Sequence, residues 1–134
     1  MRLTFNVLWF EDTIEFLNPI IKGLNDHLDE QGFYLHNHPI EKNSENLIDI
    51  IQKINEKKLD VDLILMDYKL SGGDKGDELI KIIRNHKLLT DIIFYSQDPS
   101  FRERIGLLEG VYLTDRKSLP EKVVGPDGSV GIRQ

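Results

Sequence analysis

Five polar residues in this chain come after short apolar runs, at four places, and together their side chains could form a charged ligand site. They are the acid pair Glu11 and Asp12, the lone acid Asp67, the hydroxyl of Ser96 and the amine of Lys117. The run before Asp67, Leu63-Ile64-Leu65-Met66, is typical of a strand in the middle of a parallel sheet. Because open α/β sheets bind ligands at the carboxyl ends of their strands, we expect these groups to meet along one sheet edge.

The elements that must position these residues are indicated by short apolar runs that alternate with segments of helical periodicity. Strands are expected at Leu3–Phe10, Phe33–His36, Asp62–Met66, Asp91–Tyr95 and Gly110 to about Thr114. Helices are expected up to about Gln31, at roughly Ser44–Lys57, at about Gly76–Asn85, and from a cap at Asp98 with Pro99 in the first helical position. This alternation predicts a parallel sheet flanked by helices.

Pro19 complicates the first helical segment, because proline is tolerated best in the first turn of a helix. We therefore expect Asn18 to cap a helix that begins at Pro19, with Thr13–Leu17 as a separate turn. In the second helix, Leu47, Ile48, Ile51 and Ile54 are expected on one buried face.

The end of the chain departs from the alternating pattern. Residues 118–134 are rich in proline and glycine, and Gly125-Pro126-Asp127-Gly128 between two valine-containing stretches resembles a hairpin turn. We expect a domain over residues 1–117 and an atypical C-terminal tail over 118–134, either a hairpin or the start of a further region. A fifth helix is expected to be short or absent.

Bulk properties exclude several classes of protein. A length of 134 residues suits one globular domain, and a net charge of -6 argues against direct binding of nucleic acid, whose phosphates require basic surface. The absence of cysteine excludes disulfides, thiolate catalysis and cysteine zinc sites. No signal peptide and no run long enough to cross a membrane is recognisable, so we expect a cytoplasmic protein.

The arrangement resembles the receiver domain of bacterial two-component response regulators, over Leu3 to about Lys117. The resemblance rests on the acid pair, on Asp67 after its strand, on Gly76-Asp77-Glu78-Leu79 downstream, on Ser96 and on Lys117, with the last two at separations close to those usual in the family. It implies an α/β fold, a doubly wound five-stranded parallel sheet in the flavodoxin-like order 2-1-3-4-5 with helices on both faces.

The resemblance also implies a chemistry for the acids. Asp67 would attack a phosphorus centre and hold the phosphoryl group as an acyl phosphate. Asp12 and Asp67 would bind Mg²⁺, with Glu11 acting directly or through water and the backbone carbonyl of Lys69 as a further ligand. Because phosphoryl transfer depends mainly on positioning and charge neutralisation, the cation would be essential.

The remaining two residues would sense the phosphoryl group. Lys117 would pair with one phosphoryl oxygen, and Ser96 would donate its hydroxyl to another and draw its loop inward as a switch. The implied donor is a histidine kinase or a phosphotransfer protein, and the output an effector domain or partner protein. Such a domain is not an enzyme on an outside substrate; at most it catalyses its own phosphorylation and dephosphorylation.

Several positions depart from the family's pattern. The separation between the acid pair and the acceptor is longer than usual, which predicts an extended loop or helix in the first half. Ser71 replaces a usual proline, and the bulky Gln97 follows the serine of the switch. The aromatic residue expected three positions before the lysine is Thr114, with Tyr112 five before; if Tyr112 is aligned instead, Asp115 takes the place of the lysine.

These departures leave alternatives open. A degenerate receiver could act as a phosphorylation-independent interaction module, and taken singly each acid could merely cap a turn or helix. A Mg²⁺-dependent phosphohydrolase would need Asp-x-Asp, which neither Asp67-Tyr68-Lys69 nor Glu11-Asp12-Thr13 provides. His36 and His38 could form a metal pair, although a role on the surface of an edge strand is the simpler interpretation.

Overall fold

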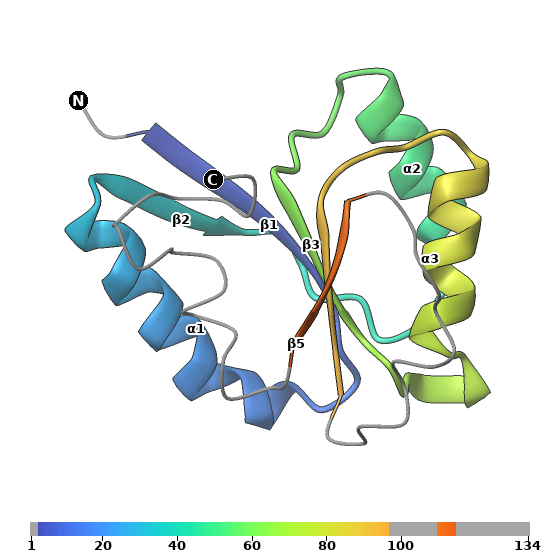
Figure 1. Ribbon diagram of the computed structural model, residues 1–134, viewed down its shortest axis with the longest axis horizontal. Coiled ribbons are helices and arrows are strands. Elements are labelled where there is room, and N and C mark those ends of the chain that lie inside the picture. Colours follow the sequence, from blue (N-terminus) through green and yellow to red (C-terminus); the bar gives the residue numbers. More distant parts are fainter. Residues whose placement is uncertain (1–2, 97–109, 115–134) are drawn as a thin grey trace.

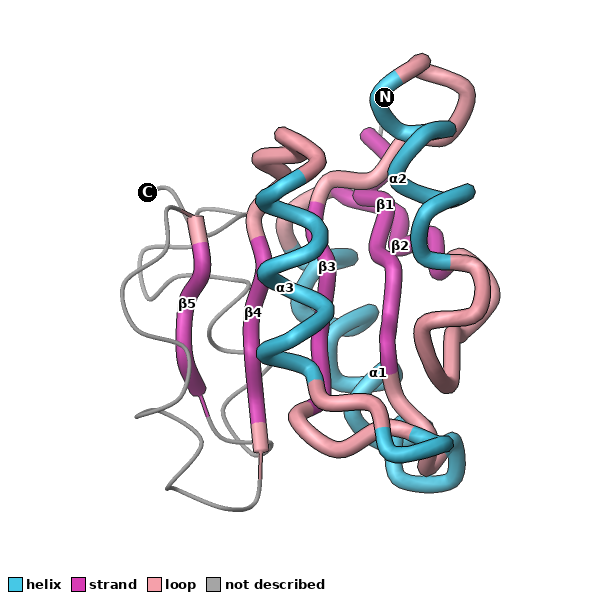
Figure 2. The backbone as a smooth tube through the Cα atoms, turned by 90° about the vertical axis from the view of Figure 1, so that its right-hand side faces the viewer, coloured by secondary structure: helices cyan, strands magenta, loops and turns pink. Residues whose placement is uncertain are grey.

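The computed structural model describes residues 3–96 and 110–114, and its framework is a single five-stranded sheet. The strands are β1 (Leu3–Phe10), β2 (Phe33–Asn37), β3 (Leu63–Asp67), β4 (Ile92–Tyr95) and β5 (Val111–Thr114). All neighbouring strands are parallel and their order is β2-β1-β3-β4-β5, which can be followed in Figures 1 and 2. The fold class and the strand order expected from the sequence are therefore confirmed.

Helices cover both faces of this sheet. Helix α1 (Ile14–Glu30) lies on one face, whereas α2 (Leu47–Asn55) and α3 (Gly76–Asn85) lie on the other (Figures 1 and 2). A short 3-10 turn, η1 (Ser71–Gly73), precedes α3. The three helices occur within the described residues and give the doubly wound arrangement.

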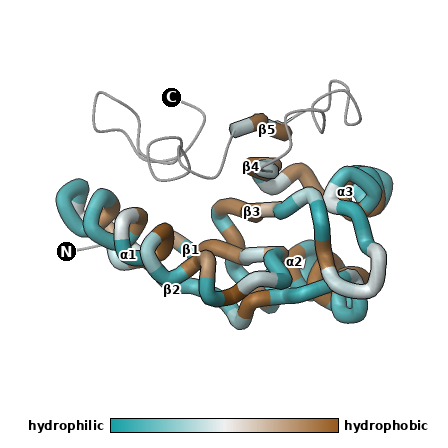
Figure 3. Tube along the Cα trace, turned by 90° about the horizontal axis from the view of Figure 1, so that it is seen from below, coloured by the Kyte–Doolittle hydropathy of each residue, from teal (hydrophilic) through white to brown (hydrophobic). Residues whose placement is uncertain are grey.

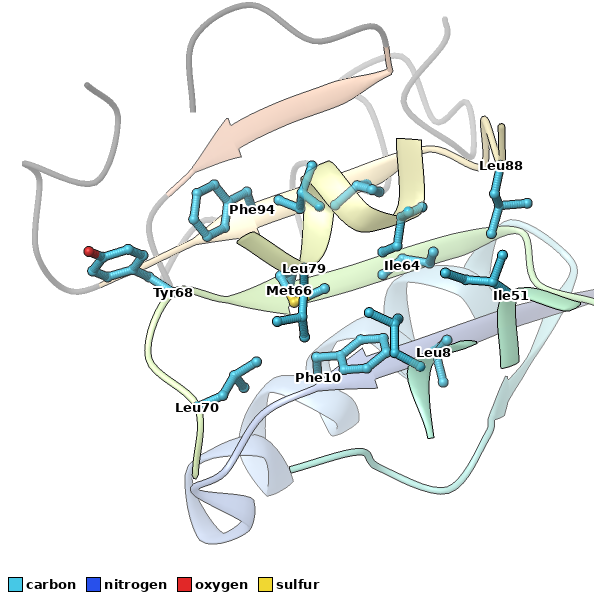
Figure 4. Close-up of a cluster of buried hydrophobic side chains, with 14 residues drawn as sticks. Leu8, Phe10, Ile51, Ile64, Met66, Tyr68, Leu70, Leu79, Leu88 and Phe94 are labelled. Atoms are coloured by element: carbon cyan, nitrogen blue, oxygen red, sulfur yellow. The ribbon is translucent and has the colours of Figure 1, made fainter. Parts of the chain in front are cut away.

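The sheet separates two apolar cores, because successive side chains of a strand point to opposite faces. On β1, Val7 and Trp9 pack toward α1, while Leu8 and Phe10 pack toward α2 and α3. Figure 3 shows the apolar colour concentrated on the strands and the polar colour on the outer sides of the helices. The core on the α2 and α3 side, drawn in Figure 4, gathers large side chains from the sheet and from these two helices, including Phe10, Met66, Leu79 and Phe94.

Helix α1 runs through Pro19 without interruption, so the predicted separate turn and the Asn18 cap are wrong. Proline removes the N–H that would bond the carbonyl of Glu15, four residues earlier. Both Pro19 and Glu15 are exposed, so water can bond this carbonyl instead. The buried residues Leu17 and Leu24, on either side of the proline, keep the helix packed on the sheet.

Helix α2 is shorter than expected at both ends. It begins at Leu47, after a turn in which the Leu47 N–H donates to the carbonyl of Ser44 at 3.1 Å, and it ends before Lys57, which adopts a positive φ of 61°. Its apolar face is also narrower than predicted, since Leu47 and Ile51 are buried but Ile48 is 52% exposed. Helix α3 has the predicted bounds, and its residues Leu79, Ile80 and Ile83 are buried.

The predicted helix after Asp98, the side chains of Gln97 and Lys117, and the 118–134 tail lie outside the described residues. Among the residues that are described, no helix is both long and apolar enough to cross a membrane.

Candidate functional site

The register of the sheet places three polar side chains at its carboxyl edge on the α1 side. Asp67 is the last residue of β3 and pairs in register with Tyr95, while Met66 pairs with Phe10, the residue before Glu11. Leu65 and Trp9, two positions earlier on their strands, belong to the core beneath α1. Because side chains alternate, Glu11, Asp67 and Tyr95 follow these residues on the same face.

Three carboxylates meet at this edge. Oxygen atoms of Glu11, Asp12 and Asp67 all lie within 4.8 Å of one another, and this is the one such group of potential metal ligands among the described residues. Glu11 is fully buried, Asp67 is 2% exposed and Asp12 is partly exposed. Three carboxylates this close repel one another when ionised, and a hard divalent cation with oxygen ligands relieves that repulsion. The donor set therefore fits Mg²⁺.

The carboxylate of Glu11 is held in place through both of its oxygens. The hydroxyl of Tyr95 donates to Oε1 at 3.0 Å in a buried hydrogen bond, and the backbone N–H of Thr13 donates to Oε2 at 3.2 Å. Asp12 is more loosely held, with its Oδ1 accepting from the Thr13 hydroxyl at 3.3 Å. Glu11 is thus fixed through both of its oxygens, whereas the hydrogen bond given for Asp12 comes from its chain neighbour.

Tyr95 was not among the residues predicted for the site. The sequence signal for Tyr95 is that it directly precedes Ser96 at the end of a strand. It lies two positions after Ile93 and therefore on the same face of β4, the face toward the acids. That its hydroxyl reaches Glu11 across the intervening strand β3 is visible only in the structure.

The loop after Asp67 is anchored at Gly76, the first residue of α3. The Gly76 N–H donates to the carbonyl of Tyr68 at 2.7 Å. A Cβ at position 76 would collide with the carbonyl oxygen of Asp67 and would lie 2.9 Å from Cε1 of Phe94. Glycine is therefore required at this position because two backbones approach closely, not because of its φ angle.

Within this loop, Lys69 forms an isolated bridge with Lys75, and the Leu70 N–H donates to the carbonyl of Asp74 at 3.0 Å. The chain reverses through Gly72, whose φ of 74° is unfavourable for other residues. Lys69 lies two positions after Asp67, and the role of its carbonyl as a metal ligand stays a prediction.

Ser96 lies directly after β4, beside the end of β3, and is 7% exposed. The structure therefore brings Ser96 to the edge that carries the three acids. Thr114, at the end of β5, pairs with Tyr95 and is also buried, whereas Tyr112 pairs with Ile93 nearer the middle of the sheet. Lys117 and Asp115, the two candidates for the lysine position, lie outside the described residues.

A connection between β2 and α2, residues 38–46, accounts for part of the long separation between the acid pair and Asp67. We call it the β2–α2 segment. It first continues alongside β1, where the Glu41 N–H donates to the carbonyl of Trp9 and the Glu11 N–H donates to the carbonyl of Glu41, both at 2.9 Å. The β2–α2 segment is thus an ordered loop beside the site.

The same segment then binds the loop that follows Asp67. The Ser71 N–H donates to the carbonyl of Lys42 at 3.0 Å, and the Ser44 N–H donates to Oδ2 of Asp74 at 2.8 Å. The β2–α2 segment in this way connects Glu11, at the end of β1, to the loop that carries Lys69.

The histidine pair, His36 on β2 and His38 just after it, does not form part of the acidic group. The His36 and His38 rings lie edge to face with centroids 4.8 Å apart, and Nε2 of His38 lies 2.7 Å from the carbonyl oxygen of Asp60. In the described part of the chain neither joins a group of three potential metal ligands, which agrees with a role on the edge strand.

Comparison with known sequences gives no assignment: no protein-family model and no curated protein matches the chain. Solved structures do match. The signal receiver domain of a DNA-binding response regulator from Colwellia psychrerythraea is 16% identical, with 89% of this chain and 94% of that chain covered and a TM-score of 0.64. The receiver domain of the response regulator PhyR from Erythrobacter litoralis is 20% identical, with 85% and 79% covered and a TM-score of 0.57.

A longer protein is matched as well. The response regulator RcsB from Salmonella typhimurium is 22% identical, and the match covers 91% of this chain but 56% of that chain, with a TM-score of 0.65. At these identities the likeness concerns the fold. The chain therefore has the fold of response-regulator receiver domains, as its sequence pattern predicted.

Proposed function

We propose that this chain is a signal receiver that accepts a phosphoryl group on Asp67 with the help of Mg²⁺. The observation that carries the proposal is the group of three carboxylates from Glu11, Asp12 and Asp67, within 4.8 Å at the ligand-binding edge of a receiver fold. A single acid at a strand end is often only a cap, whereas three buried or partly buried acids that converge point to a shared cation.

In this proposal the carboxylate of Asp67 attacks the phosphorus atom of the donor. A bond forms between a carboxylate oxygen and phosphorus as the bond to the donor's leaving group breaks, and the product is an acyl phosphate. Mg²⁺, when bound, neutralises the charge of the phosphoryl oxygens. Asp12 and Asp67 supply its principal carboxylates, with Glu11 direct or through water and the carbonyl of Lys69 as a further ligand.

Ser96 and Lys117 would complete the site. Ser96 donates its hydroxyl to a phosphoryl oxygen, which draws the loop after β4 inward, and Lys117 pairs with another oxygen as a point charge. The readout is this displacement of the loop, a local change of charge converted into a change of surface.

The proposed donor is a histidine kinase or a phosphotransfer protein, and the proposed output is an effector domain or a partner protein. The net charge of -6 argues against direct binding of nucleic acid by this chain. We place the protein in the cytoplasm and assign it no turnover on an outside substrate, only catalysis of its own phosphorylation and dephosphorylation.

The test is intact-mass spectrometry after incubation with Mg²⁺ and a small-molecule phosphodonor at neutral pH. Wild type should gain one phosphoryl group, whereas Asp67→Asn and a Mg²⁺-free sample should gain none. Asp26→Asn, an exposed acid on α1, is the matched control and should be phosphorylated like wild type. If folded wild type gained nothing at any donor concentration, the proposal would be refuted.

One observation favours a second candidate, a degenerate receiver that binds a partner without phosphorylation. The position that would carry the family's aromatic residue before the lysine holds Thr114, which is buried at the end of β5. The same experiment separates the two candidates, because the interaction module predicts a folded protein that takes no phosphoryl group and is not stabilised by Mg²⁺.

A further inference from the structure

The fully buried side chain of Tyr95 lies directly beneath the acidic site. Tyr95 has no exposed surface and packs in the α1-side core with Trp9, Leu17 and Leu65. It is the last residue of β4, which is separated from β1 by β3. Its ring therefore extends across the end of β3, the strand that ends at Asp67, to reach Glu11.

The contact at the end of that reach is polar and shielded from water. The Tyr95 hydroxyl donates to Oε1 of Glu11 at 3.0 Å, and both residues are fully buried. A buried carboxylate that lost this donor could not easily replace it with water. The hydrogen bond consequently fixes the direction in which the remaining lone pairs of Glu11 point.

We propose that Tyr95 is a positioning residue for the cation: through Glu11 it orients the acidic site and couples the cation to strand β4. This inference rests on the proposed function, since it concerns the same cation. The partners of ligating groups hold them in one orientation, and their loss typically weakens metal binding by about 10- to 100-fold.

Tyr95 also links the acidic site to the residue that follows it in the chain. Tyr95 is followed directly by Ser96, the residue proposed to respond to the phosphoryl group. The carbonyl of Tyr95 accepts a hydrogen bond from the Tyr68 N–H at 3.1 Å. The ring of Tyr95 thus connects the acid pair after β1 to the end of β4 over the end of β3. Cation binding and the position of the Ser96 backbone share this one side chain.

The test measures Mg²⁺ affinity by titration calorimetry of the whole chain. Tyr95→Phe keeps the ring in the core and removes only the hydroxyl, so the dissociation constant should rise about 10- to 100-fold. Tyr34→Phe is the matched control, because Tyr34 lies on the edge strand β2 and is 57% exposed. Its dissociation constant should equal that of wild type.

A double-mutant cycle separates positioning from packing. If Tyr95 acts through Glu11, Tyr95→Phe should have little further effect on Mg²⁺ affinity in a Glu11→Gln background. An equal loss in both backgrounds would show that the hydroxyl acts through the core and would overturn the proposal. The near-ultraviolet tyrosine spectrum of wild type should change on addition of Mg²⁺; an unchanged spectrum would overturn it even if the Phe variant failed to fold.

The outcomes also distinguish this inference from the proposed function. If Tyr95→Phe binds Mg²⁺ like wild type while wild type is phosphorylated, the positioning role is refuted and the receiver stands. If wild type binds no Mg²⁺ and takes no phosphoryl group, both are refuted.

Discussion

Replacing Gly76 with alanine tests how closely the start of α3 packs against β3. Taken alone, the substitution should stabilise the protein, because alanine is favoured over glycine in helices by up to about 1 kcal/mol. Against this, the new Cβ would collide with the carbonyl of Asp67 and would lie 2.9 Å from Phe94 and 3.0 Å from Met66. The sign of the change in stability therefore reports which effect is larger.

The surrounding groups leave little room for relaxation. The Asp67 carbonyl belongs to β3 in the middle of the sheet, and the side chains of Met66 and Phe94 are fully buried. Overpacking a buried site typically costs about 1 to 3 kcal/mol, and here the upper part of that range applies because three groups are met at once. After subtraction of the helical gain, we expect Gly76→Ala to lower the free energy of unfolding by about 2 kcal/mol, or about 8 °C in Tm.

The assay is urea unfolding followed by the fluorescence of Trp9, which is the single tryptophan and is fully buried. Asn18→Ala, at an exposed position of α1, measures helix propensity without a steric term and should raise stability by about 0.5 kcal/mol. A Gly76→Ala variant that is as stable as wild type, or more stable, would refute the close approach of α3 to Asp67.

Three further substitutions test other contacts by the same urea assay. Asp74→Ala should lower the free energy of unfolding by about 1 to 2 kcal/mol, because the Ser44 N–H loses a charged acceptor; no change would mean that this bond does not hold the β2–α2 segment. Asn37→Ala should cost about 1 to 3 kcal/mol and alter the emission of Trp9, whose Nε1–H donates to Asn37 Oδ1 at 2.8 Å; an unaltered spectrum contradicts this. Pro19→Ala should stabilise the protein by about 1 to 3 kcal/mol by restoring an N–H within α1, and a loss of stability would show that the proline suits the helix.

The strands and the meeting of the acids could be predicted from the sequence because both follow from local rules. The run before Asp67 is long enough and apolar enough to mark a buried strand, and the carboxyl ends of parallel strands share one edge. Those two rules are sufficient to bring Glu11 and Asp12 to Asp67, as the structure shows.

Other features depend on the environment of a residue and could not be read from its type. Whether Pro19 breaks a helix depends on whether the carbonyl that it leaves unbonded is exposed, and Ile48 is 52% exposed although its periodicity places it beside the buried Leu47 and Ile51. The bond between Tyr95 and Glu11 depends on the register of two strands that are not neighbours. The β2–α2 segment has no period, so its sequence gives no sign that it is ordered.

The backbone bonds of that segment have a consequence for how the site moves. The amides of Glu11, Glu41, Ser44 and Ser71 all lie outside the strands and the α-helices, yet each is bonded to a distant part of the chain. In hydrogen exchange they should be protected together with the sheet and released in the same opening event. The loops on this side of Asp67 therefore form a fixed frame rather than a lid.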